Sequence, residues 1–144
     1  MARPREYDPA PLTLALANTE ATQALDELIV LRIIGAIDKT LGEAVTVLQR
    51  HGAEEVNPQV LRLAVVRRLT EILHGYTSLQ AAEALAEGMP RVGIADGLGW
   101  ASGSTIRKNL GDLDALVQAR RQATRTGEPV TVDLAGAKYQ LMPQ

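Results

Sequence analysis

The side chains best suited to chemistry are concentrated in residues 102–109, where hydroxyl, guanidinium, ammonium and amide groups follow one another closely. Arginine and lysine bind phosphate oxygens and the acceptor atoms of guanine, and serine, threonine and asparagine bind phosphates or base edges. This combination indicates contact with a nucleic acid. The candidate contact residues are Ser102, Ser104, Thr105, Arg107, Lys108 and Asn109, joined by Lys138 from a later segment.

Residues 93–110, GIADGLGWASGSTIRKNL, have the pattern of two helices joined by a turn. Ala95 is small where the helices would cross, and Gly99 can adopt the left-handed conformation that ends a helix. Beyond the turn, apolar residues recur every three or four positions, which predicts one helix over about residues 103–125. Its core side would carry Ile106, Leu110, Leu113 and Val117. Its exposed side would carry Ser104, Lys108, Gly111 and Ala115, flanked by Arg107 and Thr105.

Residues 19–50 predict a long helix, because apolar residues recur there every three or four positions. Its middle, residues 27–37, is apolar nearly all round, so it must be covered on more than one side. Either a second copy of the chain or another element of the same chain could cover it, and the sequence leaves both open. The predicted dimer contact consists of Leu28, Ile29, Ile33, Ile37 and Leu41.

The remaining segments predict two further helices and a hairpin. Asn57 and Pro58 open a helix that should reach Gly75, and a capping box of Thr77 and Gln80 predicts a separate helix over residues 79–87. Residues 130–141 alternate between apolar and polar, which predicts two strands around Ala135 and Gly136. We therefore expect an extended arm over residues 1–18, a helical dimerisation segment over residues 19–56 and a DNA-binding domain over residues 57–144.

The composition narrows the class of protein. The chain has 144 residues, 46% hydrophobic, with no Phe and 3% aromatic residues, which favours helices packed on small aliphatic side chains. The net charge is −2, but residues 91–125 carry six Lys and Arg against three Asp and Glu, so the positive excess coincides with the candidate contact residues. No apolar run is long enough to cross a bilayer and no signal peptide is evident, so we expect a cytoplasmic protein.

The sequence offers little for catalysis or metal binding. There is no Cys, and the only two His residues, His51 and His74, are far apart in sequence, so we expect neither a metal site nor a cofactor. A glycine-rich phosphate cradle over residues 93–105 is a rival interpretation, but the lysine of a GxxxxGK[ST] loop is absent. No triad or paired-carboxylate motif occurs, and we expect no enzyme activity.

From residue 57 onward, the predicted order of helices followed by a hairpin resembles winged helix-turn-helix proteins. The resemblance rests on Ala95, Leu98, Gly99 and Trp100, followed by Ser104, Thr105, Ile106, Leu110 and Leu113. It implies a mainly α fold, with N-terminal helices and a winged helix-turn-helix whose C-terminal β-hairpin is the wing. It also implies that Lys138, near the hairpin turn, could reach a phosphate.

The function that the sequence predicts is sequence-specific binding of duplex DNA by a dimeric transcriptional regulator. The helix beginning at about residue 103 would be the recognition helix, because its polar end could enter a major groove. The alternative is a non-enzymatic protein–protein interaction module, in which the same helix docks a protein partner.

Overall fold

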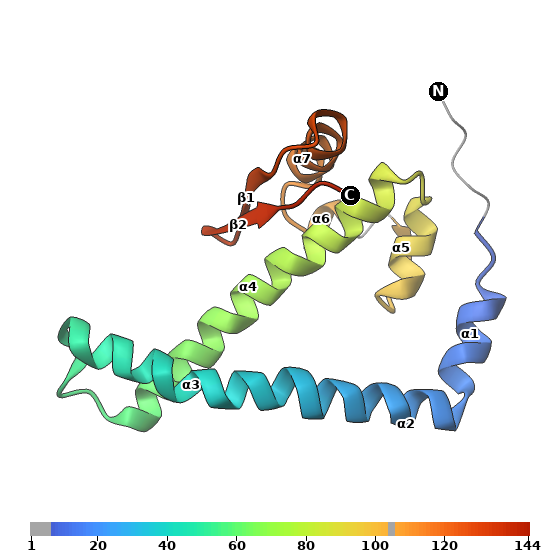
Figure 1. Cartoon of the computed structure of the whole chain (residues 1–144). Helices are drawn as coiled ribbons and strands as arrows, with labels where there is room; N and C mark the ends of the chain where they lie inside the picture. The colour runs from blue at the N-terminus through green and yellow to red at the C-terminus, as the bar shows by residue number, and fades with distance from the viewer. Residues whose placement is uncertain (1–6, 104–105) are drawn as a thin grey trace. The chain divides into compact units, whose positions relative to one another are not determined.

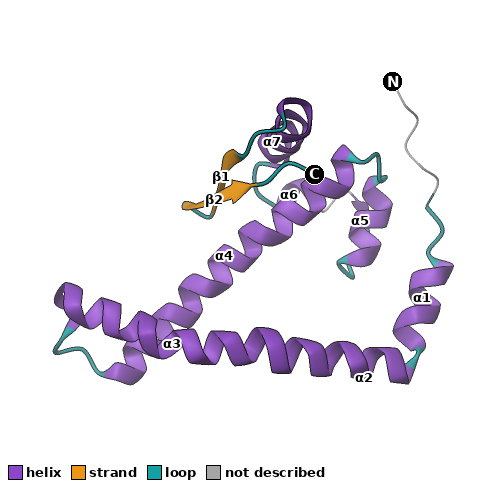
Figure 2. Cartoon of the chain, in the orientation of Figure 1, coloured by secondary structure: helices purple, strands orange, loops and turns teal. Residues whose placement is uncertain are grey.

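The computed structural model describes residues 7–103 and 106–144 and confirms a mainly helical chain that ends in a β-hairpin (Figures 1 and 2). The chain forms two compact units, one of residues 10–70 and one of residues 71–144 with the segment up to Pro9. Helix α4 (Pro58–Ala86) contributes to both. The units thus divide after Pro9 and within α4, whereas the sequence placed its boundaries after residues 18 and 56. None of the helices in the described part of the chain has the length and apolar character needed to cross a membrane.

The unit of residues 10–70 is built on the long helix predicted for residues 19–50. It consists of α2 (Thr19–Leu28), the π-helical η1 (Ile29–Ile34) and α3 (Gly35–Leu48), which follow one another without a break. Asn18 caps its start, since its side chain accepts a hydrogen bond from the Ala21 amide at 3.1 Å. After η2 (Gln49–Ala53), the chain turns into the first part of α4, whose Leu61 is buried, as is Val45 of α3.

The N-terminal arm is not extended throughout, because residues 10–17 form helix α1 (Ala10–Ala17). Its sequence, APLTLALA, is rich in alanine and leucine, which favour helices, and its only proline stands in the first turn, where no hydrogen bond is lost. The prolines at the start of the chain indicated extended backbone, but the propensity of the residues that follow outweighs them.

Helix α4 is continuous where the sequence predicted two helices separated between Gly75 and Leu79. Thr77 does not cap a new helix; its hydroxyl donates to the Leu73 carbonyl within the same helix at 3.0 Å. Gly75 lies inside this helix, and its missing side chain makes room for the hairpin. A Cβ built at Gly75 would lie 2.9 Å from the Leu134 Cα, so the two backbones are in direct contact.

The unit of residues 71–144 holds the main core. It contains the second part of α4, then α5 (Arg91–Gly97), α6 (Ile106–Asn109), α7 (Leu113–Thr126), and strands β1 (Val130–Leu134) and β2 (Ala137–Leu141). The strands pair antiparallel with the register Val130 to Leu141 and Leu134 to Ala137, joined by Ala135 and Gly136, both with positive φ. The predicted hairpin is confirmed at the same residues. The buried core side chains of this unit include Leu79, Ala82, Ile94, Ala95, Ile106, Leu110, Leu113, Leu116, Val117, Val132, Leu134 and Leu141.

The single helix predicted over residues 103–125 is wrong, because the chain turns between α6 and α7. Leu110 leaves the helix, and the Asp112 side chain caps α7 by accepting a hydrogen bond from the Ala115 amide at 3.3 Å. The four apolar residues that suggested one helix are nonetheless all buried. The periodic apolar pattern thus continues from α6 through the turn into α7, and all of its residues face the same core.

Candidate nucleic-acid interface

The segment that carries most of the predicted contact residues is held on the core by two residues one helical turn apart. Ile106 at the start of α6 is fully buried, and Leu110 just beyond its end is 6% exposed. Opposite them, Ile94 and Ala95 of α5 are buried in the same cluster, and Trp100 from the intervening turn packs against it. The predicted core-facing side of this segment is therefore confirmed, and α6 is fixed against α5.

The turn after α6 is fixed by a serine on α4. The Ser78 hydroxyl, 2% exposed, accepts a hydrogen bond from the Gly111 amide at 3.1 Å and donates to the His74 carbonyl at 3.3 Å. The Gly111 amide belongs to neither helix, so Ser78 supplies the acceptor that a helical carbonyl would otherwise provide. This contact spans 33 positions of sequence and stabilises the turn at Gly111.

Replacing Ser78 with alanine is expected to lower the free energy of unfolding by about 1 kcal/mol, the usual net contribution of one hydrogen bond. The Gly111 amide should also exchange its hydrogen with solvent faster, measured by NMR. Thr77→Ala is the matched control, because that hydroxyl bonds only within α4. Equal exchange at Gly111 in both variants would contradict the assignment of Ser78 as the residue that fixes the turn.

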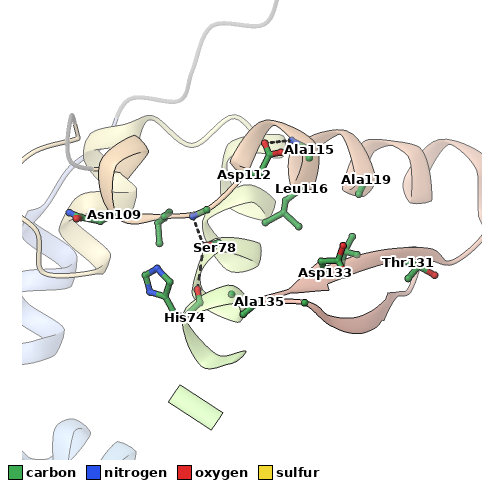
Figure 3. A pocket seen from close by; sticks show the side chains of 15 residues that line it. His74, Ser78, Asn109, Asp112, Ala115, Leu116, Ala119, Thr131, Asp133 and Ala135 are labelled. Carbon is green, nitrogen blue, oxygen red and sulfur yellow. Dashed lines mark hydrogen bonds between the residues drawn. The ribbon is translucent and has the colours of Figure 1, made fainter. Parts of the chain in front are cut away.

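A pocket of about 700 Å³ opens between α4, the turn after α6, the start of α7 and the hairpin (Figure 3). Small residues line part of it, among them Gly111 and Ala115. The sequence placed these two residues on the exposed face of one recognition helix; they are exposed, but they line this pocket beside the hairpin. The polar side chains around it come from four segments: His74, Ser78, Asn109, Asp112, Thr131 and Asp133.

The predicted contact residues have different positions in the structure. Asn109 ends α6, is exposed and lies at one side of the pocket in Figure 3, and Ser102 is exposed in the turn that precedes α6. Arg107 and Lys108 belong to the backbone of α6, while their side chains fall outside the described part of the structure. Ser104 and Thr105 lie outside the described residues altogether. The described backbone thus brings Arg107, Lys108 and Asn109 onto one short helix.

Lys138 lies on β2 and is already paired. Its ammonium group is 2.7 Å from the Asp133 carboxylate of β1, which stands opposite it in the strand register. Both side chains are well exposed, so this ion pair is weak and easily exchanged for another partner. A phosphate contact by Lys138 would have to compete with Asp133.

The N-terminal segment reaches α5 through Tyr7. The Tyr7 hydroxyl donates a hydrogen bond to the Asp96 carboxylate, and the tyrosine ring lies against Gly93. The carboxylate raises the pKa of Tyr7 from its ordinary value of 10.0 to about 12, because it accepts a hydrogen bond from the protonated hydroxyl and would repel a phenolate. This contact joins the first described residues to the helix that precedes the candidate interface.

Two residues that the sequence analysis did not single out anchor α7. The Arg120 guanidinium is buried, forms an ion pair with Glu83 of α4, and donates to the Met142 carbonyl at 2.8 Å. The spacing offered a signal for the burial of Arg120, because it follows Leu116 by four and Val117 by three positions and therefore shares their buried side.

Comparison of this chain with protein families, with curated proteins and with solved structures finds no match.

Proposed function

We propose that the chain is a sequence-specific duplex DNA-binding protein, a dimeric transcriptional regulator of the winged helix-turn-helix type, with residues 102–109 as its contact segment. The observation that carries the proposal is the burial of Ile106 and Leu110 beside Ile94 and Ala95 of α5. A recognition helix must be held rigidly by a second helix so that its exposed side can enter a groove, and this shared core holds α6 against α5 in that way. The hairpin that follows α7 supplies the wing.

The chemistry of the segment supports the same proposal. In this proposal, Arg107 pairs with guanine, and Lys108 binds guanine or a phosphate. Ser102, Ser104, Thr105 and Asn109 supply further contacts to phosphates or base edges, and Lys138 reaches a phosphate by exchanging Asp133 for it. Because α6 spans only Ile106–Asn109, the base contacts made from this helix are confined to a single helical turn. Such a short reading element binds weakly alone, so the proposal requires two copies on adjacent half-sites.

The exposed apolar surface of residues 10–70 supports a homodimer. Of the five predicted dimer residues, Leu28, Ile29 and Ile33 are exposed by 53%, 37% and 52% of their surface. Ile37 and Leu41 are half-buried and line a groove with the first part of α4. Both possibilities that the sequence left open thus find support, because α4 lies beside the later half of the long helix while the earlier half is uncovered by the described residues of its unit.

The test is the combined substitution Arg107→Ala and Lys108→Ala, measured against a duplex selected from a random pool. We expect the affinity to fall by at least about 10-fold, because a bidentate contact with guanine contributes about 1–3 kcal/mol. The slope of the logarithm of affinity against the logarithm of salt concentration should become shallower by up to about 2, roughly one unit for each phosphate contact removed. Fold and oligomeric mass should not change.

The matched control is Arg121→Ala with Arg125→Ala, which removes the same charge from exposed positions of α7. This variant should bind within about threefold of the native chain, since both residues lie on α7, outside the proposed contact segment, and solvent-exposed charges are screened by salt. An equal loss in both variants would show a nonspecific charge effect and refute the assigned contact residues. If no duplex binds even at low salt, the DNA-binding proposal is wrong and a protein partner becomes the favoured function.

A further inference from the structure

The pocket between α4, the turn after α6, α7 and the hairpin has a size and a lining that the proposed DNA contact does not use, apart from Asn109 at its side. Every residue that lines it belongs to the unit of residues 71–144. Its volume of about 700 Å³ lies within the range of about 300–1,000 Å³ in which proteins bind small molecules. The pocket is therefore large enough for a small organic ligand.

Small residues create the space, and two contacts keep it open. The Ser78 hydroxyl holds the Gly111 amide at 3.1 Å, and the backbones of α4 and the hairpin meet where Gly75 lies against Leu134. The surrounding segments are thus fixed in the chain itself, so a ligand has little to order when it binds. The lining residues with no side chain or only a methyl group are Gly75, Gly111, Ala115, Ala119, Ala135 and Gly136.

The lining combines aliphatic surface with acidic groups. Leu110, Leu116 and Val132 supply the aliphatic part. Asp112 at the start of α7 and Asp133 on β1 supply two carboxylates, and both residues are exposed (Figure 3). Among the described residues that line the pocket, none is a lysine or an arginine. The pocket therefore repels an anion, including a phosphate of DNA, and attracts a cation.

Each carboxylate can accept more hydrogen bonds than the one described for it. The Asp112 Oδ1 accepts the hydrogen bond of the Ala115 amide, and the Asp133 Oδ1 accepts one from the Lys138 ammonium group at 2.7 Å. A carboxylate has two oxygens with about four acceptor positions, so both groups retain acceptor capacity. The pair of Asp133 with Lys138 is exposed and weak, so a ligand ammonium can share this carboxylate or displace the lysine.

We propose that the pocket binds a small organic cation, a primary amine with an apolar body. The ammonium group pairs with Asp133, the apolar body lies against Leu116 and Val132, and Asp112 adds to the negative potential that attracts the ligand. Thr131 lies two positions before Asp133 on β1 and shares its side of the strand, so its hydroxyl is a further acceptor for the ammonium group.

This inference goes beyond the proposed function and does not rest on it, so its test uses the whole chain without DNA. The probes are phenethylamine, phenethyl alcohol and phenylacetate, which share a phenyl ring on a short chain and differ in the charge of the terminal group. Phenethylamine should shift the NMR signals of the Gly111, Ala115 and Ala135 amides in a saturable manner, with a dissociation constant in the millimolar range. Phenethyl alcohol should bind more weakly, and phenylacetate should leave these signals unchanged.

Two substitutions test which groups hold phenethylamine. Asp133→Asn should weaken its binding by about two- to fivefold, the effect of one exposed ion pair. Asp114→Asn is the matched control, because Asp114 is exposed on α7 but does not line the pocket. Ala115→Trp should weaken binding more than Asp133→Asn does, because the indole fills space that the phenyl ring would occupy. Gln118→Trp, likewise exposed on α7 outside the pocket, should leave the affinity unchanged.

The inference is overturned if phenethylamine causes no saturable shift at the pocket amides, or if phenethyl alcohol or phenylacetate binds as well as the amine does. It is also overturned if Asp133→Asn or Ala115→Trp binds phenethylamine with native affinity, or if Asp114→Asn weakens binding as much as Asp133→Asn. A failure to bind any duplex would refute the proposed function and leave this inference unaffected.

Discussion

Glu83→Ala is expected to lower the free energy of unfolding by about 3–5 kcal/mol, because it leaves a buried cation without its partner. The Arg120 side chain is 8% exposed, and Glu83 supplies the carboxylate that pairs with it. The Nε of Arg120 is buried and has no hydrogen-bond partner among the described residues. Removing the carboxylate therefore leaves the buried guanidinium with the Met142 carbonyl but without an ion-pair partner among the described residues. The measurement is chemical denaturation followed by circular dichroism.

Two comparison variants separate the ion pair from a general effect of losing a nearby carboxylate. Glu87→Ala, at the exposed position directly after the last residue of α4, should change stability by less than about 0.5 kcal/mol. The double variant Glu83→Met with Arg120→Met should recover most of the lost stability, since replacing both members of a buried pair by apolar residues is often close to neutral. A double variant as unstable as Glu83→Ala would contradict this explanation.

The hairpin and the long helix were predictable because their signals are local. Alternating apolar residues around Ala135 and Gly136 determined both strands, and the spacing of apolar residues determined the helix over residues 19–50. The core side of α6 was predictable for the same reason, since Ile106 and Leu110 are one turn apart. Where neighbouring residues alone decide the structure, periodicity is a reliable guide.

The remaining features depend on contacts between distant parts of the chain. The turn between α6 and α7 is held in part by the Ser78 hydroxyl, 33 positions away, and the apolar spacing that continues through it gives no sign of a break. Arg120 is buried because Glu83 and the Met142 carbonyl receive its guanidinium. The recognition helix is thus shorter than the sequence suggested, and the break after it is held both by the Asp112 cap of α7 and by Ser78 of α4.

Gly75→Ala should reverse the usual effect of replacing a helical glycine and destabilise the protein. In an open helix this change stabilises by about 0.5–1 kcal/mol, because alanine loses less backbone entropy. At Gly75 the new Cβ would lie 2.9 Å from the Leu134 Cα and 3.0 Å from the Ala135 amide nitrogen, so the hairpin must move. Three side chains of the hairpin are nearly fully buried and would lose part of that burial: Val132, Leu134 and Leu141. Complete exposure would cost about 1.5–3 kcal/mol for each side chain.

The expected net result is a loss of about 2–4 kcal/mol, with helix content retained and the amides of β1 and β2 exchanging faster with solvent. Gly97→Ala is the matched control: it is helical, belongs to the same unit and has no atom within 4 Å of its Cβ position, so the substitution should be neutral or stabilising. If Gly75→Ala stabilised the chain as Gly97→Ala does, the hairpin would not rest on α4. In the proposed function, displacing the wing should also weaken DNA binding without altering the oligomeric mass, because Gly75 and the predicted dimer contact residues lie in different units.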